Sequence, residues 1–143
     1  MNVFGLPLHP LVVHGAVVLI PLACLGALAV LISARARERY GWLTVAFAVA
    51  AAGSAIVAKL SGEVLAATLG AGRLVATHEA WGDVLPYPTV ALAVALPVAL
   101  LLRPRSTAGW WVAAAVSALA AVAGLVLVAL TGHSGATAVW GGT

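Results

Sequence analysis

The sequence predicts an all-α protein: an integral membrane four-helix bundle with both termini on the extracytoplasmic side. Of its 143 residues, 64% are hydrophobic and only 8% are charged, whereas an ordinary soluble domain is about 25% charged. The apolar residues form four long runs, and about 20 such residues cross a bilayer. Most basic residues lie between these runs. The whole chain, residues 1–143, is therefore expected to be one transmembrane domain.

The first predicted span covers residues 10–32. Proline at the first position of a helix loses no hydrogen bond, so Pro10 is expected to start this span with His9 at the cap position. The other predicted spans are residues 41–60, 85–102 and 110–130. Small residues at helical spacing allow helices to pack closely in a bilayer. The fourth span carries such a stripe at Ala113, Ser117, Ala121 and Gly124.

Two segments outside the spans are more polar or richer in glycine. Residues 61–84 are expected to form the extracytoplasmic connection, with a continuation of the second span or a short helix over 63–69. A turn at 70–72 and a short helix over 74–82 at the membrane interface are expected next. Alternatively, either helical segment, 63–69 or 74–82, is the overhanging end of a neighbouring span. Residues 131–143 are expected to form a glycine-rich tail.

Five arginines predict the orientation of the chain in the membrane. They lie in the connections after the first and third spans, at Arg35, Arg37, Arg39, Arg103 and Arg105. The positive-inside rule puts these connections in the cytoplasm. Both termini then face outward from what is expected to be the bacterial inner membrane, crossed several times. The positive charge is thus a topology signal and does not indicate nucleic acid binding.

With this orientation all four histidines fall on the outer side. His9 and His14 open the first span, His78 precedes the third, and His133 follows the fourth. An ionisable side chain at a membrane boundary is costly to keep and is a candidate functional residue. Neutral imidazole binds iron, copper and zinc, and helix bundles build such sites from facing helices. The histidines therefore predict a metal or haem site.

Each of these residues also has a simpler interpretation. His9 could only cap its helix, and His78 with Glu79 could be an ordinary solvated face. His133 could belong to an unstructured tail. Lys59 and Glu63 are four residues apart and are expected to pair with each other. His14, surrounded by apolar residues a turn deeper in the span, is the hardest of the four to explain without a function.

Several of these motifs resemble the DUF2231 family of bacterial membrane proteins. The resemblance rests on the opening GLPLHPLVVH (residues 5–14), Ser61-Gly62, the histidine ahead of the third span and the closing GHSGA (residues 132–136). The chain departs from the family where Gly15-Ala16 replaces the usual Phe-Pro, and where residues 79–83 intervene before the third span. The family's domain occurs fused to Rieske-type or cytochrome c modules, which implies redox work.

The resulting hypothesis is a redox metal centre near the outer surface, with b-type haem as the expected cofactor. His14 is the expected axial ligand, paired with His78 or His133, while His9 and Glu79 orient or ligate in support. The function would be electron transfer with a redox partner protein or a quinone, rather than catalysis.

Two other classes of function stay open at this point. The same histidines, with Glu63 or Glu79, could bind a bare copper or zinc ion. The protein could also be a membrane scaffold without a cofactor. Because no charged residue lies in the middle of any predicted span, the sequence offers no proton or ion relay across the full membrane.

Overall fold

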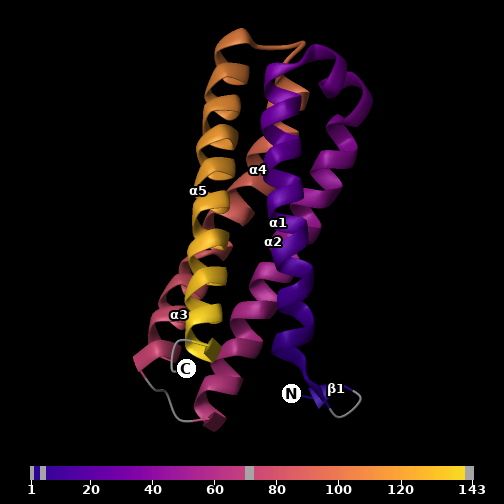
Figure 1. Ribbon diagram of the computed structural model, residues 1–143. Helices are drawn as coiled ribbons and strands as arrows, with labels where there is room; N and C mark the ends of the chain where they lie inside the picture. The colour runs from indigo at the N-terminus through magenta and orange to yellow at the C-terminus, as the bar shows by residue number, and fades with distance from the viewer. Residues whose placement is uncertain (1, 4–5, 70–72, 141–143) are drawn as a thin grey trace.

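The computed structural model describes residues 2, 3, 6–69 and 73–140. Two two-residue strands, β1 (Asn2–Val3) and β2 (Leu6–Pro7), pair antiparallel at the start of the chain. Five helices follow, and they are α1 (Leu8–Ile32), α2 (Ala34–Leu69), α3 (Arg73–Val84), α4 (Pro86–Leu102) and α5 (Thr107–Trp140). Figure 1 shows the long helices side by side, with both termini at the same end.

The all-helical class and the four membrane-crossing helices are confirmed. Four helical segments are long and apolar enough to cross a membrane, and they are Leu8–Ile32, Ala34–Thr68, Val75–Leu102 and Thr107–Thr137. Large apolar side chains lie exposed on their outer faces, including Val18 at 64% and Leu119 at 72%. Such surface would drive aggregation in water, so these side chains are suited to contact lipid. The chain is a multi-pass membrane protein.

Several helices extend beyond the predicted spans. The piece over 63–69 continues α2 without a break, and α3 continues into α4 with only Leu85 between them, where the Leu85 amide still donates to the Trp81 carbonyl at 3.2 Å. α3 is therefore the overhanging end of the third membrane helix. Prolines at 86 and 88 lie in the first turn of α4, where a proline is tolerated. The predicted turn at 70–72 lies outside the described residues.

Two local expectations were wrong. Residues 131–140 are helical and belong to α5, whereas a glycine-rich tail was expected. Glycine is tolerated in membrane helices, where it lets a neighbouring group approach. α1 begins at Leu8, so His9 lies inside the helix and does not cap it.

The core of the bundle is built mainly from small side chains. Ala23 and Ala27 of α1 are fully buried, as are Ala48 of α2 and Ala121 of α5. Ser117 is also fully buried and satisfies its hydroxyl by donating to the Ala113 carbonyl at 2.8 Å. The predicted stripe on the fourth span is thus confirmed as a packing surface.

The two halves of the chain repeat a pattern of burial and hydrogen bonding that was not predicted from the sequence. α1 corresponds to α3–α4 and α2 corresponds to α5. Adding 69 to the numbers of five buried residues of α1 gives five buried residues of the second half. These pairs are Ala16/Leu85, Ile20/Thr89, Ala23/Leu92, Ala27/Leu96 and Val30/Ala99.

The same correspondence holds between α2 and α5 with an offset of 73. Ser33 accepts a hydrogen bond from the Ala36 amide at 3.3 Å, and Ser106 accepts one from the Gly109 amide at 3.1 Å, so both caps match. The four residues by which the offsets differ lie in the connection between α4 and α5. Parallel repeats of this kind are related by an axis along the membrane normal, and binding sites lie at their interface.

Candidate functional site

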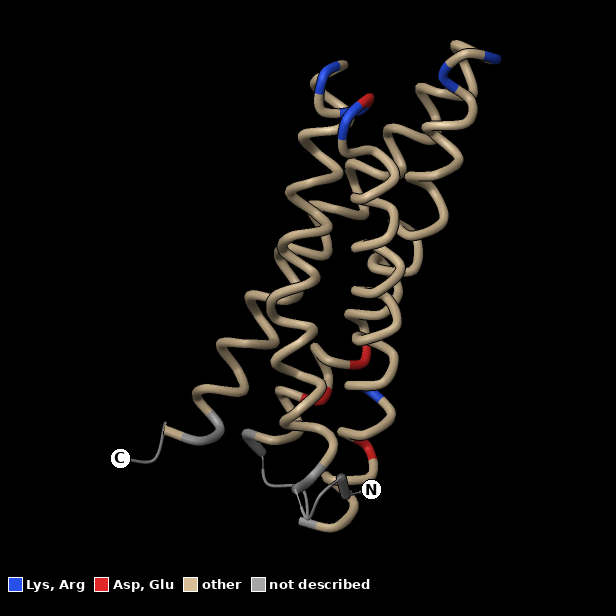
Figure 2. The backbone as a smooth tube through the Cα atoms, turned by 90° about the vertical axis from the view of Figure 1, so that its right-hand side faces the viewer, with Lys and Arg blue, Asp and Glu red and all other residues tan. Residues whose placement is uncertain are grey.

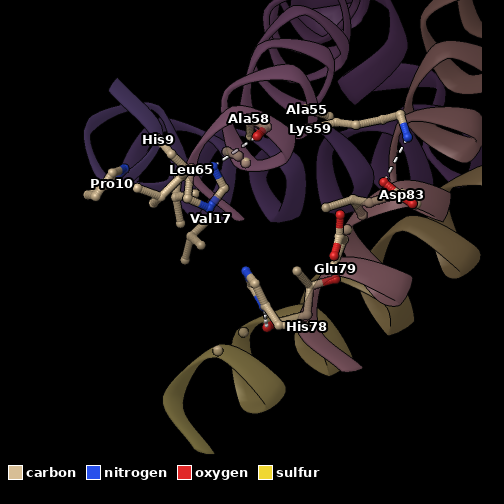
Figure 3. Close-up of a pocket in the computed structure, with 18 of the residues that line it drawn as sticks. His9, Pro10, Val17, Ala55, Ala58, Lys59, Leu65, His78, Glu79 and Asp83 are labelled. Carbon is tan, nitrogen blue, oxygen red and sulfur yellow. Dashed lines mark hydrogen bonds and ion pairs between the residues drawn. The ribbon is translucent and has the colours of Figure 1, made fainter. Parts of the chain in front are cut away.

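A pocket of about 630 Å³ lies between the two halves at the end of the bundle that carries the histidines. Its walls come from α1 and α2 on one side and from α3 and α5 on the other, and most of the lining side chains are apolar. Figure 3 shows His9 and His78 entering this space from opposite sides. The volume is within the usual range for small-molecule and cofactor sites, about 300–1,000 Å³.

His9 is held against α2 by its Nδ1 atom. Nδ1 donates to the Ala58 carbonyl at 2.9 Å and lies 3.4 Å from the Ser61 hydroxyl. Because a carbonyl oxygen can only accept, the hydrogen of the neutral ring is on Nδ1 and Nε2 keeps a free lone pair. The ring fits because residue 62 is glycine: a Cβ there would lie 3.0 Å from Cε1 of His9.

His78 repeats this arrangement in the second half of the chain. Its Nδ1 donates to the Thr131 carbonyl at 3.0 Å and lies 3.4 Å from the Ser134 hydroxyl. A Cβ at Gly135 would lie 3.1 Å from both Cε1 and Nδ1 of the ring. Ala58 and Thr131, Ser61 and Ser134, and the two glycines are equivalent positions, 73 residues apart. The same carbonyl, serine and glycine therefore orient both imidazoles.

The two rings face each other across the interface between the halves. Their centres are 6.2 Å apart and their planes cross at 76°. In Figure 3 the ring of His78 points across the pocket toward that of His9. Both Nδ1 atoms are occupied by carbonyls, so the free nitrogen of each ring is Nε2. This is the outer hydrogen bonding that fixes the tautomer of a metal-binding histidine.

The other two histidines lie differently. His14 lines the pocket but is exposed, and its Nδ1 bonds the Pro10 carbonyl of its own helix. His133 is exposed on α5 and is not among the residues that line the pocket. The structure thus brings together His9 and His78.

The two carboxylates named from the sequence also line the pocket. Glu79 lies on α3 beside His78, but the Thr131 carbonyl, not Glu79, contacts the His78 Nδ1. Glu63 pairs with Lys59 at 3.1 Å, as the four-residue spacing predicted. Lys59 also binds Asp83 at 2.7 Å, which links α2 to α3 along one flank of the pocket. Because the carboxylates are about half exposed, these ion pairs add little stability.

The arrangement suits a cofactor that needs few protein ligands. In the part of the chain that the structure describes, no group of three or more His, Cys, Asp or Glu side chains is placed to hold a metal ion. A structural zinc site usually takes four protein ligands. Haem brings four nitrogens of its own and takes two ligands from the protein. Of the three imidazoles that line the pocket, two, His9 and His78, are held by a carbonyl of another helix.

The distance between the ring centres leaves space for one metal ion between the rings. Metal–imidazole bonds are about 2.0–2.1 Å long, and with ring bonds of about 1.35 Å each ring atom lies about 1.1 Å from the ring centre. Two imidazoles that face one metal ion from opposite sides therefore have centres about 6.3 Å apart. The observed distance between His9 and His78 is 6.2 Å.

Sequence reasoning missed the role of the two Ser-Gly pairs. Ser61-Gly62 was noticed only as part of a family resemblance, and His9 was given a supporting part. The missing signal was the repeat itself: a histidine is followed by Ser-Gly 52 residues later in the first half and 56 residues later in the second.

A family model described as a predicted membrane protein (DUF2231) matches residues 5–143, almost the whole chain. No curated protein and no solved structure matches the chain.

Proposed function

The chain belongs to the DUF2231 family of predicted membrane proteins, and we propose that it is an electron-transfer protein that holds b-type haem between His9 and His78. The observation that carries this proposal is the pair of imidazoles, one from each half of the chain, with ring centres 6.2 Å apart and each Nδ1 bonded to a carbonyl. This pair replaces the sequence-based choice of His14 with His78 or His133.

The pocket favours haem over a bare ion as its occupant. A volume of about 630 Å³ is many times that needed for one metal ion, since a water molecule takes about 30 Å³ of liquid. Its mainly apolar lining provides the dry surroundings by which a protein tunes a haem potential. Held by two histidines, haem supplies one-electron transfer and offers no open coordination position to a substrate.

The residues of this chain have three tasks under this proposal. His9 and His78 would hold the haem through Nε2, while the Ala58 and Thr131 carbonyls hold the ring orientations. Gly62 and Gly135 leave room for the rings. The partner is a redox protein or a quinone, and the positive-inside rule puts the site on the outer side of the bacterial inner membrane.

A visible spectrum of the purified full chain, expressed with ample haem, tests the proposal. We expect a Soret band in the native protein, and loss of bound haem in both His9→Ala and His78→Ala. His133→Ala is the matched control, because this exposed histidine lies on α5 outside the pocket, and it should keep the native haem content. Absence of a Soret band, or unchanged haem in the His9 and His78 variants, would refute the proposal.

A bare copper or zinc ion is the second candidate, since two facing imidazoles suit a single ion of either metal. Metal analysis of the same samples separates the two. Stoichiometric copper or zinc in a native sample without a Soret band, together with loss of that metal in His9→Ala, would show that the site binds a bare ion. A sample with neither metal nor haem would leave a membrane scaffold without a cofactor as the remaining candidate function.

A further inference from the structure

The opposite end of the bundle carries a concentration of arginine. Its five arginines are opposed by one acidic residue, Glu38. Figure 2 shows blue segments gathered at this end with one red segment among them. The other three acidic residues, Glu63, Glu79 and Asp83, line the pocket at the opposite end. The ion pairs found in the described part of the chain are both made by Lys59, at the histidine end.

Two of these arginines, one from each half of the chain, converge on one tryptophan. The guanidinium carbons of Arg37 and Arg103 lie 5.7 and 4.6 Å from the centre of the Trp110 ring, within cation–π range. Trp110 is buried, with 7% of its surface exposed. Two positive charges are thus held near one ring, and neither forms an ion pair with a described carboxylate.

Arg37 is held in place and has hydrogen-bonding capacity left over. One of its terminal nitrogens donates to the Leu31 carbonyl at 2.8 Å. Its Nε atom is buried and has no hydrogen-bond partner in the described part of the chain. A buried donor without a partner is costly to keep, so the hydrogen bonds within the protein do not fully satisfy this guanidinium.

The helix ends add to the attraction for an anion. α2 begins at Ala34 and α5 at Thr107, so two helix N-termini lie at this end, and each carries a partial positive charge. A guanidinium also presents a planar fork of donors that matches the oxygens of a phosphate. The ligand chemistry favoured here is therefore a phosphate group.

We propose that Arg37 and Arg103 bind the phosphate of an anionic phospholipid headgroup in the leaflet at this end of the bundle. A lipid is favoured over free phosphate because the site lies where membrane-crossing helices end. Trp42 and Trp111 are exposed nearby, at 60% and 63%, and exposed tryptophans at helix ends lie at headgroup level. Basic pockets between membrane helices bind anionic headgroups in this way.

The test uses the full chain in neutral detergent and three probes: phosphatidylglycerol, phosphatidylcholine and inorganic phosphate. We expect phosphatidylglycerol to raise the thermal unfolding midpoint and to stay bound in native mass spectrometry, and the other two to do neither. Arg37→Gln with Arg103→Gln should weaken retention by on the order of tenfold or more, since each basic residue contributes about 1 kcal/mol at an anionic surface.

The control pair is Arg35→Gln with Arg105→Gln, which removes the same charge from the same end but leaves Trp110 and its two arginines in place. It should keep most of the retention. An equal loss in both pairs would show general charge attraction and overturn the site. Stabilisation by inorganic phosphate alone, or equally by phosphatidylcholine, would overturn the lipid assignment.

A lysine variant guards against a folding defect. Arg37→Lys with Arg103→Lys keeps the charge and removes the fork. We expect it to fold and to retain phosphatidylglycerol less well than the native protein. Full retention by this variant would show that the guanidinium geometry is not used.

Discussion

On the proposed function, Gly135→Ala should lower the haem content without unfolding the protein. The added methyl group would lie 3.1 Å from Cε1 and Nδ1 of His78, whereas carbon atoms in contact are usually about 3.5–4.0 Å apart. The ring therefore has to move by roughly 0.5 Å. Its Nδ1 bond to the Thr131 carbonyl, now 3.0 Å, would lengthen toward the limit of a hydrogen bond.

The stability terms of this substitution nearly cancel. A weakened hydrogen bond costs about 0.5–1.5 kcal/mol, while replacing glycine by alanine inside a helix gains about 0.8–1.0 kcal/mol. We expect the free energy of unfolding to change by less than about 1 kcal/mol. Ligation is more sensitive, because a metal–nitrogen bond tolerates only about 0.2 Å of displacement. Haem content should therefore fall while the fold persists.

Gly53→Ala is the matched control, because Gly53 is exposed on α2 and is not among the residues that line the pocket. No atom lies within 4 Å of its added methyl group, so it should gain stability by up to about 1 kcal/mol and keep its haem. The assay is the Soret absorbance per protein together with the thermal unfolding midpoint for both variants. Equal haem content in the two variants would refute the argument that Gly135 sets the ring position.

Two further predictions concern the ion pairs and the packing of the halves. Lys59→Met should change the free energy of unfolding little, because its partner Asp83 is about half exposed and solvent screens the pair. Unfolding at low and high salt measures this, and a loss as large as that of a core substitution would contradict it. Gly26→Ala should destabilise the protein, since the new methyl group would lie 3.0 Å from Thr44 Cγ2. The positions equivalent to Gly26 and Thr44 in the second half hold Ala95 and Ser117. Adding Thr44→Ser to the Gly26→Ala variant should therefore restore the melting temperature. No recovery would argue against equivalent packing of the two halves.

The fold was predictable from the sequence because lipid imposes simple rules. A long apolar run must cross as a helix, since only a helix satisfies every backbone group within its own segment. The four spans and the packing stripe on the fourth followed from this. The far end of the fourth span did not, because residues 131–140 continue α5 where the glycine content indicated a tail. The continuation of α2 over 63–69 was one of two alternatives that the sequence left open.

The pairing of the histidines could be predicted only in part. All four were expected at one end of the bundle, but His14 was preferred because it lies deeper in its span. Five residues along a helix correspond to a rotation of about 140°, so His9 and His14 point in different directions. His9 faces α2, where it bonds the Ala58 carbonyl, and His14 stays exposed. Only the packing of α1 on α2 decides which of the two is held against α2 and paired with His78.

The repeat explains why the site has a symmetric centre and an asymmetric flank. Both halves carry the histidine, its carbonyl and the Ser-Gly pair, so a ligand between the rings meets the same contacts from each side. Lys59 and Glu63 correspond to Gly132 and Ala136, which carry no charge. Among the described residues, the ion pairs therefore lie on one flank, where Lys59–Asp83 fastens α3 to α2. Residues that would contact a bound cofactor in the same way from both sides should occur as matched pairs, one in each half. Residues that distinguish one face of the pocket from the other should occur at positions where the halves differ.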